Sequence, residues 1–216
     1  MNCGDSALLS KSAIILAGGS SSRFGQDKGL LQLTNKPLIR HVLDRVGDIV
    51  DEKLIVVSSK SQVEQYLKVI DPSIDVLVDT ANGCGPLAGA LTGFEKACGE
   101  YSLVLPCDTP FVSKDVLLLL LELRMNKNAV IPRWPNGYIE PLQAVYRTKP
   151  ALEAARNALC AGKSNVQAMV DRLRSVRYVS TLVLEQLDPE LRTFFNVNTP
   201  LDLKKTELMF KRLNAS

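Results

Sequence analysis

The chain has 216 residues, enough for one sizeable core, and its 46% hydrophobic and 23% charged content is ordinary for a globular protein. A net charge of +3 from scattered basic residues argues against a nucleic-acid-binding surface. The longest uninterrupted apolar run, Val116 to Leu121, is too short to cross a bilayer.

The cysteines and histidine narrow the class further. The five cysteines form no CxxC pair and His41 is the only histidine, so we expect no structural zinc site. The odd cysteine count is typical of reduced thiols in a cytosol, and residues 1–11 lack the features of a signal peptide. We therefore expect a cytoplasmic protein with a single domain over residues 1–216, without nucleic-acid or membrane partners.

Strand and helix patterns alternate through the first half of the chain. Short apolar runs predict strands, and apolar residues recurring every three or four positions predict the helices between them. A capping-box spacing, Ser61 to Glu64, opens the second helix, and Ser113 caps the fourth. The predicted strands are 12–17, 53–57, 75–78 and 101–107, and the predicted helices are 37–50, 61–70, 87–98 and 113–125.

The second half is less regular. Two predicted strands, 129–134 and 138–146, flank the turn signal Pro135-Asn136-Gly137. Helical stretches begin near Lys149 and Ser164. They are followed by a strand over 176–183, a last strand over 194–197, and a terminal helix that opens at Thr199-Pro200.

This alternation predicts a three-layer α/β/α sandwich with a mostly parallel sheet. Ligands of such sheets bind beyond the carboxyl ends of the strands. Glycines or small polar residues follow four of the predicted strands at that edge: Gly18 and Gly19, Asp79, Asp108, and the pair Asn196 and Asn198. We expect these residues to converge on one site.

The loop after the first strand, which reads GGSSSRFGQDK, is suited to phosphate. Glycines expose backbone N–H groups, and Arg23 and Lys28 can neutralise phosphate oxygens. The loop is neither a Walker A motif nor a GxGxxG dinucleotide fingerprint. The alternative is an ordinary strand–helix turn with a solvated charge cluster.

Asp108 stands where a cation could bind, at the end of the run SLVLPC. Mg²⁺ commonly takes one or two carboxylates together with substrate phosphates, so this position predicts a magnesium ligand. A turn or helix-capping acid is the alternative, and Asp79 carries the same two interpretations.

Other residues give weaker signals. Alternation places Asn196 and Asn198 on one face of the last strand, which indicates a ligand contact. Glu140, beside Pro141 in a predicted strand, is a weak candidate, because an edge strand also explains the proline. The lone His41 is interpreted as structural. We propose no cysteine nucleophile, because no histidine partners a cysteine in the predicted site.

Four segments together resemble one known family. LAGGSSSRFGQDKGLL, GPLAG, PCDTPF and NVNTPLDL are similar, in this order, to the blocks of the molybdenum cofactor guanylyltransferases. The similarity spans about residues 13 to 203. The first block alone is shared with many nucleotidyltransferases, whereas all four together are much more specific.

The resemblance implies an α/β/α nucleotide-binding fold and transfer of GMP from GTP to molybdenum-molybdopterin, with release of pyrophosphate and with Mg²⁺ as cofactor. It also implies partners among molybdopterin-handling enzymes. Lys28, Arg23 and Asp108 would be catalytic, with Asp108 holding the metal, and Asn196 and Asn198 would bind the acceptor. The implied nucleotide-binding residues are Leu16, Ala17, Gly18, Gly19, Lys28, Ser58, Asp79, Gly85 and Asp108.

Departures from the family pattern are small. Phe24 replaces the usual methionine, and Ser58 stands where some members have an asparagine that contacts the nucleotide. Three alternatives stay open at this point. They are a nucleotidyltransferase that uses CTP or another phosphorylated acceptor, an idle nucleotide-binding regulator, and an adaptor that carries molybdopterin without chemistry. Retention of both the opening loop and Asp108 argues against the regulator.

Overall fold

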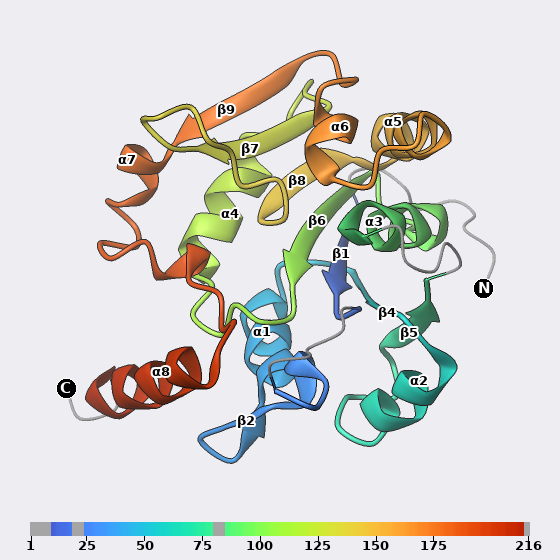
Figure 1. The fold of residues 1–216 in the computed structure, drawn as a ribbon. Coiled ribbons are helices and arrows are strands. Elements are labelled where there is room, and N and C mark those ends of the chain that lie inside the picture. Colours follow the sequence, from blue (N-terminus) through green and yellow to red (C-terminus); the bar gives the residue numbers. More distant parts are fainter. Residues whose placement is uncertain (1–9, 19–23, 80–84, 214–216) are drawn as a thin grey trace.

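The computed structural model describes residues 10–18, 24–79 and 85–213. Within these residues, a seven-stranded sheet forms the centre of the molecule (Figure 1). Its strands are β1 (Lys11–Leu16), β4 (Glu52–Val57), β5 (Asp75–Val78), β6 (Tyr101–Pro106), β7 (Ala129–Arg133), β8 (Ala144–Arg147) and β9 (Val176–Ser180).

The sheet is mostly parallel, as predicted. Its strand order is β5-β4-β1-β6-β8-β7-β9, and β8 alone among these strands runs antiparallel to its neighbours β6 and β7. In the central register, Ile14 of β1 lies between Leu54 of β4 and Val104 of β6. The carboxyl ends of β4, β1 and β6 therefore meet at one edge of the sheet.

Helices cover both faces, which confirms the three-layer architecture. Neighbouring Ile14 and Ile15 are both fully buried, but they belong to separate apolar clusters on opposite faces of the sheet. On the Ile15 face lie α1 (Leu38–Val46), α2 (Lys60–Leu67), α4 (Lys114–Glu122) and α7 (Thr181–Leu184). On the Ile14 face lie α3 (Gly85–Lys96), α5 (Thr148–Cys160) and α6 (Val166–Val170).

Helix α3 packs unusually closely against the sheet at Gly93. A Cβ at that position would lie 2.3 Å from Cγ2 of Ile14, so only glycine allows this approach. The amino end of α3 is consequently held directly over the carboxyl edge of β1 and β4.

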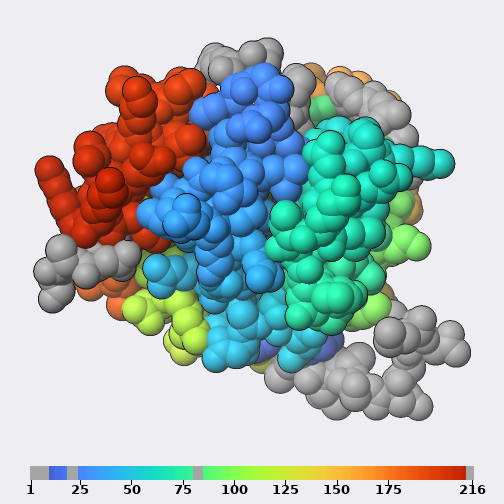
Figure 2. All heavy atoms as spheres, turned by 90° about the horizontal axis from the view of Figure 1, so that it is seen from below, coloured from blue at the N-terminus to red at the C-terminus, as the bar shows by residue number. Residues whose placement is uncertain are grey.

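A third apolar cluster joins the hairpin of β2 (Gln32–Leu33) and β3 (Lys36–Pro37) to α8 (Pro200–Leu213). The short elements η1 (Lys28–Leu30) and η2 (Arg192–Phe194) instead pack on the Ile15 face, through Leu30 and Phe194. Leu33, Leu38 and Val197 are fully buried in this cluster, and Phe210 of α8 packs against it. Figure 2 shows the C-terminal segment in red beside the blue segment around β2 and α1. This packing brings the start of α8 close to the start of η1.

One predicted strand, 138–146, is too long, and another, 194–197, does not form. Residues 138–143 do not extend β8, since Pro141 lacks an N–H and the N–H of Gln143 instead donates to the carbonyl of Glu140 in a turn. The strand predicted over 194–197 is replaced by η2 and an irregular segment. Asp188 holds that turn, because its Oδ2 accepts hydrogen bonds from the backbone N–H and the hydroxyl of Thr193.

Two smaller expectations also need correction. Ser59, not Ser61, caps α2, and its hydroxyl oxygen accepts a hydrogen bond from the N–H of Gln62. Cys98 is disulfide-bonded, so the expectation of reduced thiols is wrong there, whereas Cys107 and Cys160 carry free thiols. Among the described helices, none is long and apolar enough to span a membrane.

Candidate active site

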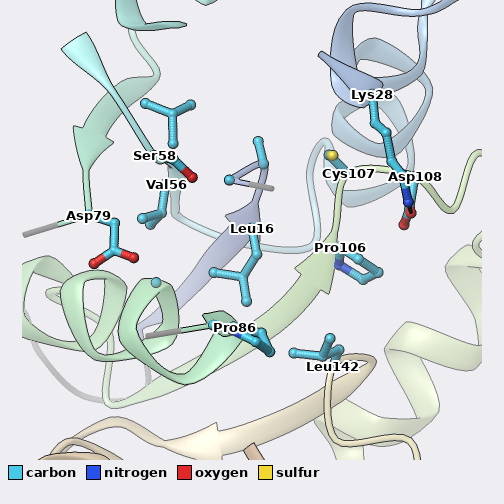
Figure 3. Close-up of a pocket in the computed structure, with 15 residues that line it drawn as sticks. Leu16, Lys28, Val56, Ser58, Asp79, Pro86, Pro106, Cys107, Asp108 and Leu142 are labelled. Atoms are coloured by element: carbon cyan, nitrogen blue, oxygen red, sulfur yellow. Dashed lines mark hydrogen bonds and ion pairs between the residues drawn. The ribbon is translucent and has the colours of Figure 1, made fainter. Parts of the chain in front are cut away.

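A cavity of about 570 Å³ lies at the carboxyl ends of β1, β4 and β6, beside the amino end of α3 (Figure 3). Most of the nucleotide-site residues expected from the sequence line it. The lining residues are Leu16, Ala17, Gly18, Lys28, Val56, Val57, Ser58, Asp79, Gly85, Pro86, Gly89, Pro106, Cys107, Asp108 and Leu142. The residues Gly18, Asp79 and Asp108, which we expected to converge at the strand ends, therefore line one cavity.

The end of β1 forms the floor of the cavity. The N–H of Ala17 donates to the carbonyl of Val56, and the carbonyl of Leu16 accepts from the N–H of Cys107, so the backbone is anchored on both sides. A Cβ on Gly18 would lie 2.5 Å from the hydroxyl oxygen of Ser58. Glycine is therefore required for the loop to pass this close to β4. Gly19 and Arg23 lie outside the described residues.

Lys28 and Asp108 face each other on one side of the cavity (Figure 3). Nζ of Lys28 lies 3.1 Å from Oδ2 of Asp108 and donates a 2.7 Å hydrogen bond to Oδ1 of Asn198. The side chains of Lys28 and Asp108 are 28% and 12% exposed, so this ion pair is largely shielded from water. Three segments distant in sequence thus meet at one ammonium group.

The backbone around Asp108 and Asn198 is fixed by hydrogen bonds. The carbonyl of Asp108 accepts from the N–H of Val197, which joins the end of β6 to the segment before α8. Oδ2 of Asp202 accepts from the N–H groups of Asn198 and Thr199, and the hydroxyl oxygen of Thr199 accepts from the N–H of Asp202. This capping box sets the position of Asn198.

Asn196 does not join the group. It is exposed and does not line the cavity, whereas Asn198 contacts Lys28. The expectation that both asparagines share one strand face is wrong because no strand forms there, so their side chains do not alternate as in a strand.

The opposite side of the cavity carries Asp79, Ser58 and the amino end of α3 (Figure 3). The N–H of Asp79 donates a 2.7 Å bond to the carbonyl of Val57, which places Asp79 directly after β5. Gly85, at the start of α3, has φ +70°. A Cβ there would lie 2.9 Å from the carbonyl oxygen of Ser164, so glycine is required. The positive end of the α3 dipole adds to the attraction of this cavity for anions.

Sequence reasoning missed part of the site. Leu142, from the segment before β8, and Pro86 of α3 supply apolar walls. Glu140 does not line the cavity. Its carboxylate accepts a hydrogen bond from the indole N–H of Trp134, and burial raises its pKa. The proline at 141, read as a sign of an edge strand, was the available signal that this segment turns toward the pocket.

Cys107 and His41 have no chemical role in this arrangement. Burial raises the pKa of the Cys107 thiol well above its ordinary value, and the charge of Asp108 raises it further. The thiol therefore stays protonated and is a poor nucleophile. Nε2 of His41 lies 3.0 Å from the carbonyl oxygen of Leu33, and its ring packs on Phe210, outside the cavity lining.

A family model for a MobA-like NTP transferase domain matches residues 13–176. A probable molybdenum cofactor guanylyltransferase from Methanosarcina mazei is 37% identical over 199 residues, which cover 90% of this chain and 88% of the relative.

Solved structures agree with the sequence relatives. Molybdopterin-guanine dinucleotide biosynthesis protein A from Archaeoglobus fulgidus superposes with a TM-score of 0.79 at 28% identity, covering 93% of this chain and 99% of that one. A 4-diphosphocytidyl-2C-methyl-D-erythritol synthase from Anaerococcus prevotii shares the fold alone, with a TM-score of 0.70 at 15% identity over 94% and 97% of the two chains. The family model covers most of the chain, and so the protein belongs to the MobA-like NTP transferase family.

Proposed function

We propose that the protein transfers GMP from GTP to molybdenum-molybdopterin, forming the guanine dinucleotide cofactor and pyrophosphate. The observation that carries this proposal is the shielded Lys28, Asp108 and Asn198 group beside a cavity at the carboxyl edge of the sheet. The 37% sequence identity to a probable molybdenum cofactor guanylyltransferase, over 90% of this chain, supports the choice of donor and acceptor.

In this proposal the cavity holds GTP between two sides. Lys28 lies on one side and attracts the triphosphate, and Ser58, Asp79 and Gly85 lie on the other side and would contact the guanosine. The positive end of the α3 dipole, which begins at Gly85, adds to the attraction of the cavity for anions. Asn198 would bind the acceptor phosphate, and Asn196 would assist it. Arg23 would assist Lys28 in binding the triphosphate.

The residues present fit a magnesium ion. Asp108 offers a carboxylate at the cavity wall, and Mg²⁺ commonly uses one or two carboxylates plus substrate phosphates. Among the described residues, no three His, Cys, Asp or Glu side chains are grouped so that they could hold a metal ion, and in this proposal the substrate phosphates supply the other ligands. When bound, Mg²⁺ would neutralise phosphate charge and orient the triphosphate.

The reaction needs charge neutralisation rather than a protein nucleophile. A phosphate oxygen of the acceptor attacks the α-phosphorus of GTP, a new phosphorus–oxygen bond forms, and the bond to the β-phosphate oxygen breaks. The electron pair leaves with pyrophosphate. Lys28 offsets the repulsion between the two anions, and the cavity holds them in position. No general base is required, because the acceptor phosphate is already ionised at neutral pH.

A pyrophosphate-release assay with the four nucleoside triphosphates, with and without metal-loaded molybdopterin, tests the proposal. We expect release that requires GTP, Mg²⁺ and the pterin together. Pyrophosphate release with CTP instead of GTP would show that the protein transfers CMP. Release with GTP and another phosphorylated acceptor would show that the pterin is not the acceptor. Pterin binding without release would identify the adaptor.

A further inference from the structure

A second polar group lies behind Lys28, centred on the preceding residue. Oδ1 of Asp27 accepts a 2.6 Å hydrogen bond from the hydroxyl of Tyr66 and a 2.8 Å bond from the N–H of Gly29. Oδ2 of Asp27 accepts from Nε2 of Gln62. Asp27 therefore joins the start of η1 to helix α2, which lies 35 or more residues away in sequence.

The hydrogen bonds of this group extend to Ser58, on the side of the cavity that also carries Asp79. Oε1 of Gln62 accepts a 2.8 Å hydrogen bond from the N–H of Ser58, which lines the cavity at the end of β4. The side-chain amide of Gln62 thus bridges the two residues, with its nitrogen on Asp27 and its oxygen on Ser58. The end of β4 and the segment that carries Lys28 are held at a fixed separation by α2.

Tyr66 makes this arrangement rigid. It is fully buried, and a Cβ on Gly29 would lie 2.1 Å from its hydroxyl oxygen, so glycine is what lets the tyrosine reach Asp27. Burial and the charge of Asp27 raise the pKa of Tyr66, so its hydroxyl stays protonated and remains a donor. The Asp27 carboxylate is partly buried and accepts from several donors, so it resists displacement, because losing a donor leaves its charge less well satisfied.

We propose that Tyr66 and Gln62 are positioning residues for the triphosphate site, holding Asp27 so that Lys28 is directed at Asp108 and Asn198. This inference rests on the proposed function of Lys28. A lysine side chain has a flexible four-carbon stem, so its ammonium is placed accurately only when its backbone is fixed. Asp27 and the Gly29 N–H fix that backbone on both sides of Lys28.

The test measures equilibrium binding of GTP with Mg²⁺ by calorimetry in Tyr66→Phe and Gln62→Ala. We expect affinity to fall about 5- to 30-fold in Tyr66→Phe, less than in Lys28→Ala, because the ammonium group is retained and only its position is disturbed. Gln62 is only partly buried, so Gln62→Ala keeps the test available if the tyrosine variant folds poorly. Thr148→Val is the matched control. It removes a buried hydroxyl with a 2.6 Å hydrogen bond to the carbonyl of Gly99 and should lose stability while retaining GTP affinity.

A double-mutant cycle with Lys28→Ala separates positioning from general stability. If Tyr66 acts through Lys28, Tyr66→Phe should change affinity less than about twofold in the Lys28→Ala background. An equal loss of affinity in both backgrounds would overturn the inference. So would unchanged affinity in Tyr66→Phe and Gln62→Ala.

Amide exchange distinguishes this inference from the proposed function. Without nucleotide, the N–H of Gly29 should exchange faster in Tyr66→Phe than in the wild type, because Asp27 has lost a holding contact. If the wild type binds none of the four triphosphates, the proposed function is wrong, and exchange at Gly29 alone decides whether Tyr66 holds Asp27. Unchanged exchange would then overturn the inference.

Discussion

The two halves of the sheet contribute unequally to the cavity. Strands β5, β4, β1 and β6 and the segments just beyond them, including Lys28 and Asp79, supply most of the lining, whereas the β8-β7-β9 half supplies Leu142. Direction is the reason for β8. Strands β4, β1 and β6 end at a common edge, whereas antiparallel β8 begins at that edge and brings only the segment before it. Strands β7 and β9 end at the same edge, but β8 separates them from β6. Catalytic side chains should therefore be concentrated in the parallel half.

The strongest test removes the carboxylate at the end of β6. In Asp108→Ala we expect turnover to fall by roughly two to three orders of magnitude, the scale for losing one well-placed electrostatic group, with the fold intact. Steady-state pyrophosphate release measures the loss, and circular dichroism checks the fold. Asp115→Ala, an exposed acid on α4, is the control. Activity within tenfold of wild type would remove Asp108 from the metal role.

Lys28→Ala should have the next largest effect. A charged hydrogen-bond donor to phosphate contributes about 1.5–3 kcal/mol, so we expect the GTP concentration for half-maximal rate to rise about 10- to 150-fold, together with a lower rate. The control is Lys114→Ala, whose partner Asp48 forms an exposed ion pair away from the cavity lining. Unchanged GTP affinity would show that the segment after β1 is not the phosphate site.

A third variant tests whether close packing of α3 holds the parallel half in shape. In Gly93→Ala, the new methyl group would overlap Ile14, so we expect a loss of about 1–3 kcal/mol in the free energy of unfolding. Urea denaturation measures it. Gly89→Ala, whose added carbon would lie 3.4 Å from Leu16, should cost less. Equal losses of stability in the two variants would mean that the contact with Ile14 does not limit how closely α3 packs against β1.

The smallest effect is expected in the other half. Leu142→Ala shortens an apolar wall, and we expect GTP affinity to fall by about fivefold or less, the scale of about 1 kcal/mol of apolar contact. Calorimetry measures it beside Lys28→Ala. A loss as large as that of Lys28→Ala would remove the distinction between the two halves of the sheet.

The cavity lining could be predicted where it depended on short segments, while the roles of its residues stay a prediction. Lys28, Asp108 and Asp79 follow strands whose apolar runs are clear in the sequence, and the rule that parallel strands end at one edge brought them together. Asn196 was misplaced because a strand was assumed where Asp188 instead holds a turn. The Asp27–Tyr66 contact gave no signal in the sequence, because Tyr66 lies within α2 and not at the end of a strand.

The sequence by itself determined the alternating elements, the layered fold and the polar residues at the strand ends, because these depend on local apolar periodicity and on glycine. Its assignment to a single domain and to the cytoplasm stays a prediction. Only the tertiary structure decided which distant groups meet: Asn198 with Lys28, Tyr66 with Asp27, and Leu142 with the cavity. Such contacts depend on how helices and irregular segments pack on the finished sheet, and no local pattern of residues determines which of these distant groups come into contact.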